Sequence, residues 1–204
     1  SGGTLDLKDG ATITGRSLNI GAGVSTINVD SGTYNFSAAN SSFGAENTSS
    51  ATSYNQTGGT ITFGQLTVAN GQLTSATLSI SAGTLNATTL RTSRGPTTTA
   101  ANDATTDAVV INISGIGLVN AGNFQFGDGA TGYYGKNTVT ITGSTAELRA
   151  TTNFNWSNNS STVRNNTVEV DGGLFSTIAT AVANTTSNAT LNIELSAIAR
   201  RHGF

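Results

Sequence analysis

The stretch YNQTGGTITFGQLTVANGQLTSATLSISAGTLNATTLRTSRG, residues 54–95, contains the pattern that decides the fold. Apolar and polar residues alternate in short runs, and the runs end at glycine-containing turns, as in TGGTITF (57–63) and SAGTLNA (81–87). Alternation with a period of two predicts β-strands, because successive side chains of a strand point to opposite faces. The stretch also holds two copies of the same pattern, which indicates an internal repeat.

Seven alternating tripeptides extend this repeat over the chain, with starts 27, 24, 33, 28, 29 and 23 residues apart. One copy cannot bury its own apolar side chains, so stacked copies must bury them together. We therefore predict an all-β solenoid of about seven to eight coils, in one domain over residues 1–204. Its core ladder is formed by the first residues of the tripeptides: Ile27, Tyr54, Leu78, Ile111, Val139, Val168 and Leu191.

Two segments interrupt the period and are expected to protrude as loops. These are residues 37–53 and residues 93–108, the second of which holds Pro96, the single proline of the chain. Proline removes a donor from a strand ladder, so its near absence elsewhere favours continuous pairing. Residues 196–204 are interpreted as a tail.

The composition excludes several classes of function. Charged residues make up 10% of the chain and the net charge is -2, while Thr, Gly, Ser and Asn account for just over half. Without a basic run, no nucleic-acid partner is expected. Without an apolar stretch of about 18 residues, no membrane insertion of this segment is expected. The absence of cysteine excludes disulfides and thiolate metal sites.

Residue types that commonly act in catalysis are few and far apart in the sequence. His202, the single histidine, lies in the tail, so no nucleophilic triad can be assembled. Asp30 and Asp171 share a repeat position but would lie about 24 Å apart, too far for a glycosidase pair. We predict no catalytic, cofactor-binding or metal-binding residues, no cofactor and no enzymatic activity.

Outward positions should carry polar groups, in a ladder of Asn28, Asn55, Ser79, Asn112, Thr140, Glu169 and Asn192. Most aromatic residues are expected inside the solenoid. Tyr133 and Tyr134 are adjacent, so one of them must face outward on an extended chain. They are the candidate residues for contact with a partner.

Residues 54–95 resemble the autotransporter-associated β-strand repeat of large bacterial surface proteins. The likeness is carried by Gly58-Gly59-Thr60 and Ala82-Gly83-Thr84, is kept at Ser31-Gly32-Thr33, and is partial at Asp171-Gly172-Gly173. Ser114-Gly115-Ile116 departs further from it. The resemblance implies a right-handed parallel β-helix exported to the cell surface, where such passengers serve as adhesins or stalks.

The leading hypothesis is a non-enzymatic structural or adhesive element at the bacterial cell surface or outside the cell, as a passenger segment or a fibre subunit. Neither end of the repeat looks capped, which predicts end-to-end self-association or continuation into a longer chain. Surface glycans are further candidate partners. The alternatives are a carbohydrate-binding or carbohydrate-active β-helix and a binder of ice or mineral faces. The last would need strict Thr-X-Thr spacing on one face, and only isolated cases such as Thr60-Ile61-Thr62 occur.

Overall fold

The computed structural model describes residues 2–44, 49–69, 73–92, 107–127, 135–156, 164–178, 180–181 and 187–193. All elements in these residues are β-strands. In chain order they are β1 (Thr4–Leu7), β2 (Thr12–Thr14), β3 (Asn19–Ile20), β4 (Gly23–Val29), β5 (Thr33–Phe43), β6 (Ser49–Val68), β7 (Leu73–Thr92), β8 (Asp107–Ile113), β9 (Leu118–Phe126), β10 (Gly135–Thr142), β11 (Glu147–Asn155), β12 (Arg164–Asp171), β13 (Leu174–Thr177), β14 (Thr180–Ala181) and β15 (Ser187–Ile193).

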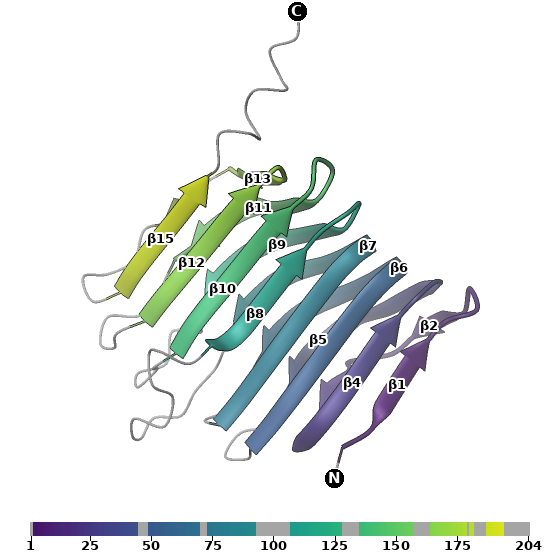
Figure 1. Ribbon diagram of the computed structural model, residues 1–204. Coiled ribbons are helices and arrows are strands. Elements are labelled where there is room, and N and C mark those ends of the chain that lie inside the picture. Colours follow the sequence, from purple (N-terminus) through teal and green to yellow (C-terminus); the bar gives the residue numbers. More distant parts are fainter. Residues whose placement is uncertain are drawn as a thin grey trace, which may run out of the picture.

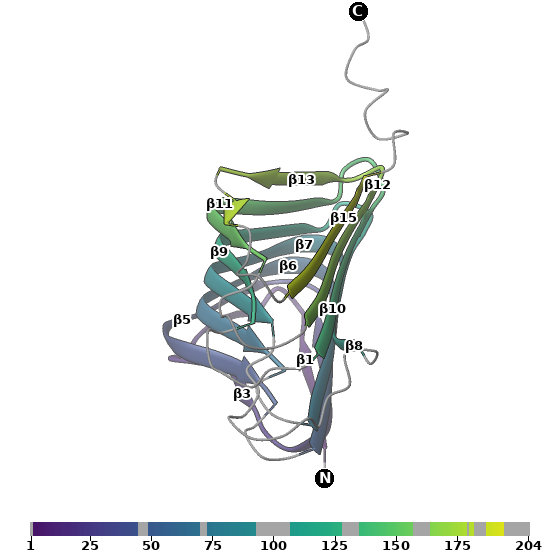
Figure 2. The same ribbon diagram turned by 90° about the vertical axis from the view of Figure 1, so that its left-hand side faces the viewer.

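The first side of the solenoid is a parallel sheet in the order β1-β4-β6-β7-β8-β10-β12-β15 (Figure 1). Its strands all run in one direction before the chain passes behind them, and the coils advance from β1 towards β15. This sense of coiling is right-handed, and Figure 2 shows the front sheet edge-on with β5, β9 and β11 set apart from it. The predicted class, an all-β parallel β-solenoid, is confirmed.

Long strands turn the corners and build the second and third sides. In β5, residues 33–36 pair with 60–63 of β6 on the second side, and residues 40–43 pair with 65–68 on the third. β6 and β7 each span 20 residues and pair with each other on all three sides. Between these two coils, backbone pairing therefore continues on all three sides, interrupted by register shifts between residues 56 and 60.

Glycine makes the corner between the first and second sides. Gly32, Gly59 and Gly83 have φ of 99°, 65° and 80°, values that side chains with a Cβ adopt only with strain. The space is also closed, because a Cβ on Gly83 would lie 2.4 Å from the carbonyl oxygen of Gly58 in the coil below. The Gly-Thr repeat of the sequence is thus a requirement of the corner.

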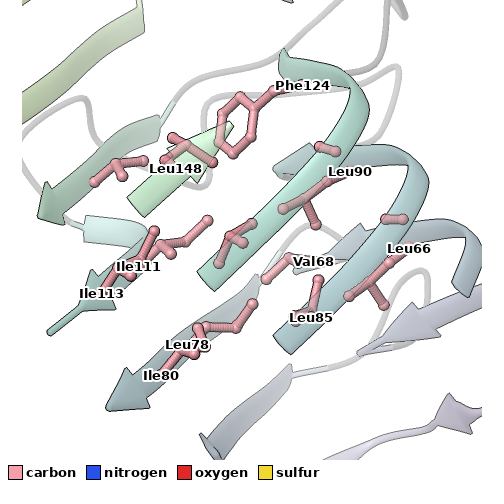
Figure 3. Packing of buried hydrophobic residues seen from close by; sticks show 14 of the residues in the cluster. Leu66, Val68, Leu78, Ile80, Leu85, Leu90, Ile111, Ile113, Phe124 and Leu148 are labelled. Atoms are coloured by element: carbon pink, nitrogen blue, oxygen red, sulfur yellow. The ribbon is translucent and has the colours of Figure 1, made fainter. Parts of the chain in front are cut away.

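The core fills the inside of the coils with aliphatic and aromatic side chains. Leu66, Leu90 and Phe124 occupy one register position on successive coils and are fully buried (Figure 3). Rings also stack along the axis, with centroids 5.0 Å apart between Phe124 and Phe154. Such ladders bury apolar surface that one coil alone would expose to water.

The prediction of a protruding loop over residues 37–53 is wrong for the described part of that segment. Residues 37–43 belong to β5 and residues 49–53 to β6. Ser41 and Phe43 are buried, because they stack on Leu66 and Val68 of the next coil. The strand was missed because its alternating inward positions are occupied largely by small residues, which look like a loop in the sequence.

The number of coils also differs from the prediction. Among the described residues, only the coils between the start of β4 and the end of β11 have at least three paired residues on each of their three sides. At the first turn β3 has two residues, and so does β14 near the last. Complete turns are therefore fewer than the predicted seven to eight. Residues 93–106 of the second predicted loop and the tail 196–204 lie outside the described residues, while residues 107–108 begin β8.

Candidate functional site

The predicted core ladder is a single column of the first sheet. Ile27 pairs with Tyr54, Tyr54 with Leu78, and Leu78 with Ile111. The column continues through Val139 and Val168 to the backbone position of Leu191. The described side chains of this column, from Ile27 to Val168, are 0% exposed. Leu5, which the sequence reading left out, begins the column opposite Ile27.

Two polar columns flank this ladder on the outer face of the first sheet. The first contains Thr4, Thr26, Ser53, Thr77, Thr138 and Thr167, is interrupted by the apolar Val110, and continues in the backbone register to position 190. The second is the predicted outward ladder from Asn28 to Asn192, extended by Asp6 at its start. We name the second one the amide column. The sequence signal for Asp6 was the match of TLDL (4–7) to the repeated tripeptides, one coil before the first of them.

Side-chain hydrogen bonds link three neighbouring coils at the start of the amide column. The Asn55 amide donates to Asn28 Oδ1 at 3.0 Å, and the Asn28 amide donates to Asp6 Oδ1 at 2.7 Å. Similar bonds join Asn120 to Asn86 and Asn153 to Asn123 on the other sides. Because an amide both donates and accepts, such a column can continue indefinitely.

Some of the acidic residues are engaged in separate structural contacts. Glu147 forms an ion pair with Arg149 at 2.7 Å and accepts a hydrogen bond from Ser176 at 3.2 Å. The hydrogen bond and the charge of Glu147 raise the pKa of the Arg149 guanidinium. Asp30 accepts a hydrogen bond from Thr57 at 3.1 Å. The hydrogen bonds from Ser176 and Thr57 connect one coil with another, the ion pair lies within β11, and none of these contacts brings two carboxylates together.

Glu169 lies exposed in the amide column between Thr140 and Asn192. Asp171 is opposite Thr142, and Asp30 stands at the equivalent corner near the other end of the stack. At about 4.8 Å per coil their separation is the predicted ~24 Å, far above a glycosidase spacing. Within the described residues no three His, Cys, Asp or Glu side chains cluster to hold a metal ion.

The aromatic side chains that the structure describes line the interior. Phe36 stacks on Phe63 and Phe43 on Tyr54, at centroid distances of 6.1 and 5.8 Å. Burial raises the pKa of the Tyr54 phenol well above its usual value. The candidate contact residues Tyr133 and Tyr134, together with His202, lie outside the described residues.

The two ends of the first sheet are its remaining distinctive features. In the described residues β1 pairs only with β4, and β15 only with β12. Around β1 the apolar side chains of Leu5, Leu18 and Ile20 are only partly buried. Within the part of the chain that the structure describes, the first coil therefore presents a backbone edge without a partner strand, together with an incompletely covered layer of core.

Over the described ranges, no helix has the length and apolar character needed to cross a membrane. Comparisons of the chain with protein-family models, with curated proteins and with solved structures find no match.

Proposed function

We propose that the chain is a non-enzymatic structural or adhesive element of a bacterial cell surface, working as a passenger segment or as a fibre subunit. The observation that supports this most is the outer wall of the first sheet. There, side chains that are mostly hydroxyls and amides run in columns across the coils, and hydrogen bonds link the first three members of the amide column. Such a wall suits a rod that must be long, stiff and well hydrated.

The placement of charge supports the same function. Glu147, Asp30 and Asp6 each use one carboxylate oxygen to accept a hydrogen bond from a neighbouring coil. A glycosidase instead needs two carboxylates facing one substrate bond about 5–10 Å apart. The sequence resemblance to surface-protein repeats adds the proposed location, on the outside of the cell.

Immunogold labelling of intact cells of the encoding organism tests the location. The expected result is label on the outer surface, lost when the cells are treated with a protease before labelling. Label that appears only after the cells are permeabilised would contradict the proposal.

Incubation of the purified chain with a panel of polysaccharides tests the alternative of a carbohydrate-active β-helix. We expect no release of reducing sugar. Cleavage that is lost in Glu147→Gln or Glu169→Gln, but kept in the distant variant Asp6→Asn, would establish that alternative instead.

A further inference from the structure

The first coil leaves the end of the apolar core uncovered. Ile13 is 41% exposed, whereas Tyr34, its partner in the second coil, is fully buried. Leu5 is likewise only partly buried, while its partner Ile27 is 0% exposed. Another coil stacked on this layer would remove the remaining apolar surface from water, which is favourable at about 25 cal/mol per Å².

The backbone edge of β1 is open on the same side. The Gly3 and Leu7 carbonyls accept hydrogen bonds from Thr26 and Asp30 in the second coil. In a parallel sheet, successive residues of a strand form their backbone hydrogen bonds alternately with the strand on one side and the strand on the other. The N–H and C=O groups of Thr4 and Asp6 therefore point away from β4. An unpaired edge of this kind is a template for another strand.

The opposite edge of the stack has the complementary arrangement. In each junction, the residue whose side chain points inward forms its backbone hydrogen bonds with the next coil. For example, the Ile80 carbonyl accepts a hydrogen bond from the Ser114 N–H. By the same alternation, Leu191 and Ile193 of β15 direct their backbone groups away from β12. The outer edge of β15 thus carries backbone groups placed to bond a following coil, and the outer edge of β1 carries backbone groups placed to bond a preceding coil.

We propose that copies of this chain associate head to tail, with β15 of one copy pairing in parallel with β1 of the next. This inference rests on the proposed structural role and specifies its partner and register. Residues 190–193, TLNI, stack on residues 4–7, TLDL, in the register of every other junction. In backbone register, position 190 then continues the threonine column, position 191 the core ladder and Asn192 the amide column.

Asp6 gives this register a specific polar contact. Asn28 donates to Asp6 Oδ1, and Asp6 Oδ2 accepts no hydrogen bond from the described residues. A carboxylate only accepts, whereas the exposed Asn192 carries an amide donor. The junction therefore matches a donor at the end of one copy with an acceptor at the start of the next. Because this contact joins two different surfaces, it repeats without closing and produces a filament.

Proline at the open edge tests the pairing. Asp6→Pro removes an N–H that points away from β4, while Asp6→Ala loses the same carboxylate and keeps the N–H. We expect light scattering of the wild-type chain to show mass growing with concentration, and electron microscopy to show filaments one solenoid wide. Asp6→Ala should still form filaments and Asp6→Pro should not. A wild-type monomer at all concentrations, or filaments of Asp6→Pro equal to wild type, would overturn the proposal.

Cysteine cross-linking tests the register even where the proline variant perturbs the first coil. The chain contains no cysteine. Strands in register lie about 4.8 Å apart, a separation that a disulfide can span. Under oxidising conditions Thr4→Cys/Thr190→Cys should give a ladder of covalent oligomers that a reductant dissolves. The control Thr77→Cys/Thr190→Cys, with one thiol in the middle of the same column, should stay monomeric.

Covalent oligomers in both double variants, or in neither, would contradict the register. These assays use purified chain alone, so their failure is distinct from a failure of the proposed surface role. Filaments without surface label would refute the proposed location at the cell surface. Surface label without filaments would refute the proposed head-to-tail association.

Discussion

Tyr54 and Gln56 form a buried polar pair inside a wall of aliphatic side chains. The Tyr54 hydroxyl donates to Gln56 Oε1 at 2.8 Å, and the Gln56 amide reaches the carbonyls of Gly58, Gly59 and Thr84. Burial of these groups is tolerated because each one has a partner. The pair fastens the corner of its own coil to the next coil, a role that one buried apolar residue could not take.

Tyr54→Phe should therefore destabilise the chain in a pH-dependent way. At neutral pH we expect a loss of about 1–2 kcal/mol in the free energy of unfolding, because Gln56 Oε1 loses its donor. Burial raises the pKa of Tyr54, so above about pH 10 the unfolded state binds fewer protons than the folded one. Wild-type stability then falls with rising pH through this group, a contribution that the variant lacks.

Urea unfolding of both proteins at pH 7, 9 and 11 measures this effect. The stability difference between wild type and Tyr54→Phe should narrow above pH 10. A difference that stays constant over the range would show that the phenol is not held protonated by burial. Tyr34, whose pKa is also raised, titrates in both proteins and cancels in the comparison.

Gly59 is the second residue whose role can be tested directly. Its φ is 65°, and an added Cβ would lie 2.9 Å from the carbonyl oxygen of Gly32 in the coil below. Gly59→Ala should lower the free energy of unfolding by about 1–3 kcal/mol. Gly21→Ala is the control, because a Cβ there meets no atom within 4 Å. Equal stabilities of the two variants in thermal denaturation would refute the steric account of the corner.

At the scale of the element, the strands in the middle of the stack have one side of their pleat in the core and the other in water. Ile80 of β7 is 0% exposed and pairs with Ile113, while Ser79 and Asn112 stand beside them on the outer face. Each coil shares its core with both neighbours, so a defect in one strand is transmitted to the adjacent strands.

Ile80→Asp should for this reason unfold several coils, since an unpaired buried carboxylate costs several kcal/mol, roughly. Asn112→Asp introduces the same charge one coil away on the outer face and should change stability by less than about 0.5 kcal/mol. Hydrogen exchange read out strand by strand distinguishes the two. Loss of protection confined to β7, or an equal loss in both variants, would contradict the shared core.

At the scale of the whole molecule, the solenoid is a stack in which a coil contacts mainly its neighbours. Ser53 is opposite Thr77 and Tyr54 is opposite Leu78, so residues 54–77 amount to one full turn. After their removal, Ile80 would stack on Val29 and Gly83 on Gly32, positions of the same kind.

Deletion of residues 54–77 should consequently leave a folded rod that is one coil shorter, by about 4.8 Å. Deletion of residues 54–78 removes one residue more and exchanges the inner and outer faces of the junction, so that variant should lose its structure. Circular dichroism and small-angle scattering compare the two. Unfolding of both variants, or folding of both, would show that coil register does not control this fold.

The sequence by itself determined the strand period, the positions of the corner glycines and the column that joins Ile27 to Leu191. These features depend on local sterics and on side-chain alternation, which are contained in windows of a few residues. The close fit of Gly83 against the Gly58 carbonyl explains why the glycine signal is so regular.

Only the tertiary structure decided which polar residues belong to strands and which acidic groups meet a partner. Residues 40–43 form part of a strand because the next coil covers Ser41 and Phe43 with Leu66 and Val68. Glu147 meets both Arg149 and Ser176, the second of them 29 residues away in the chain. Burial and pairing are properties of neighbouring coils, so a window of sequence about one strand long does not contain the residues that produce them.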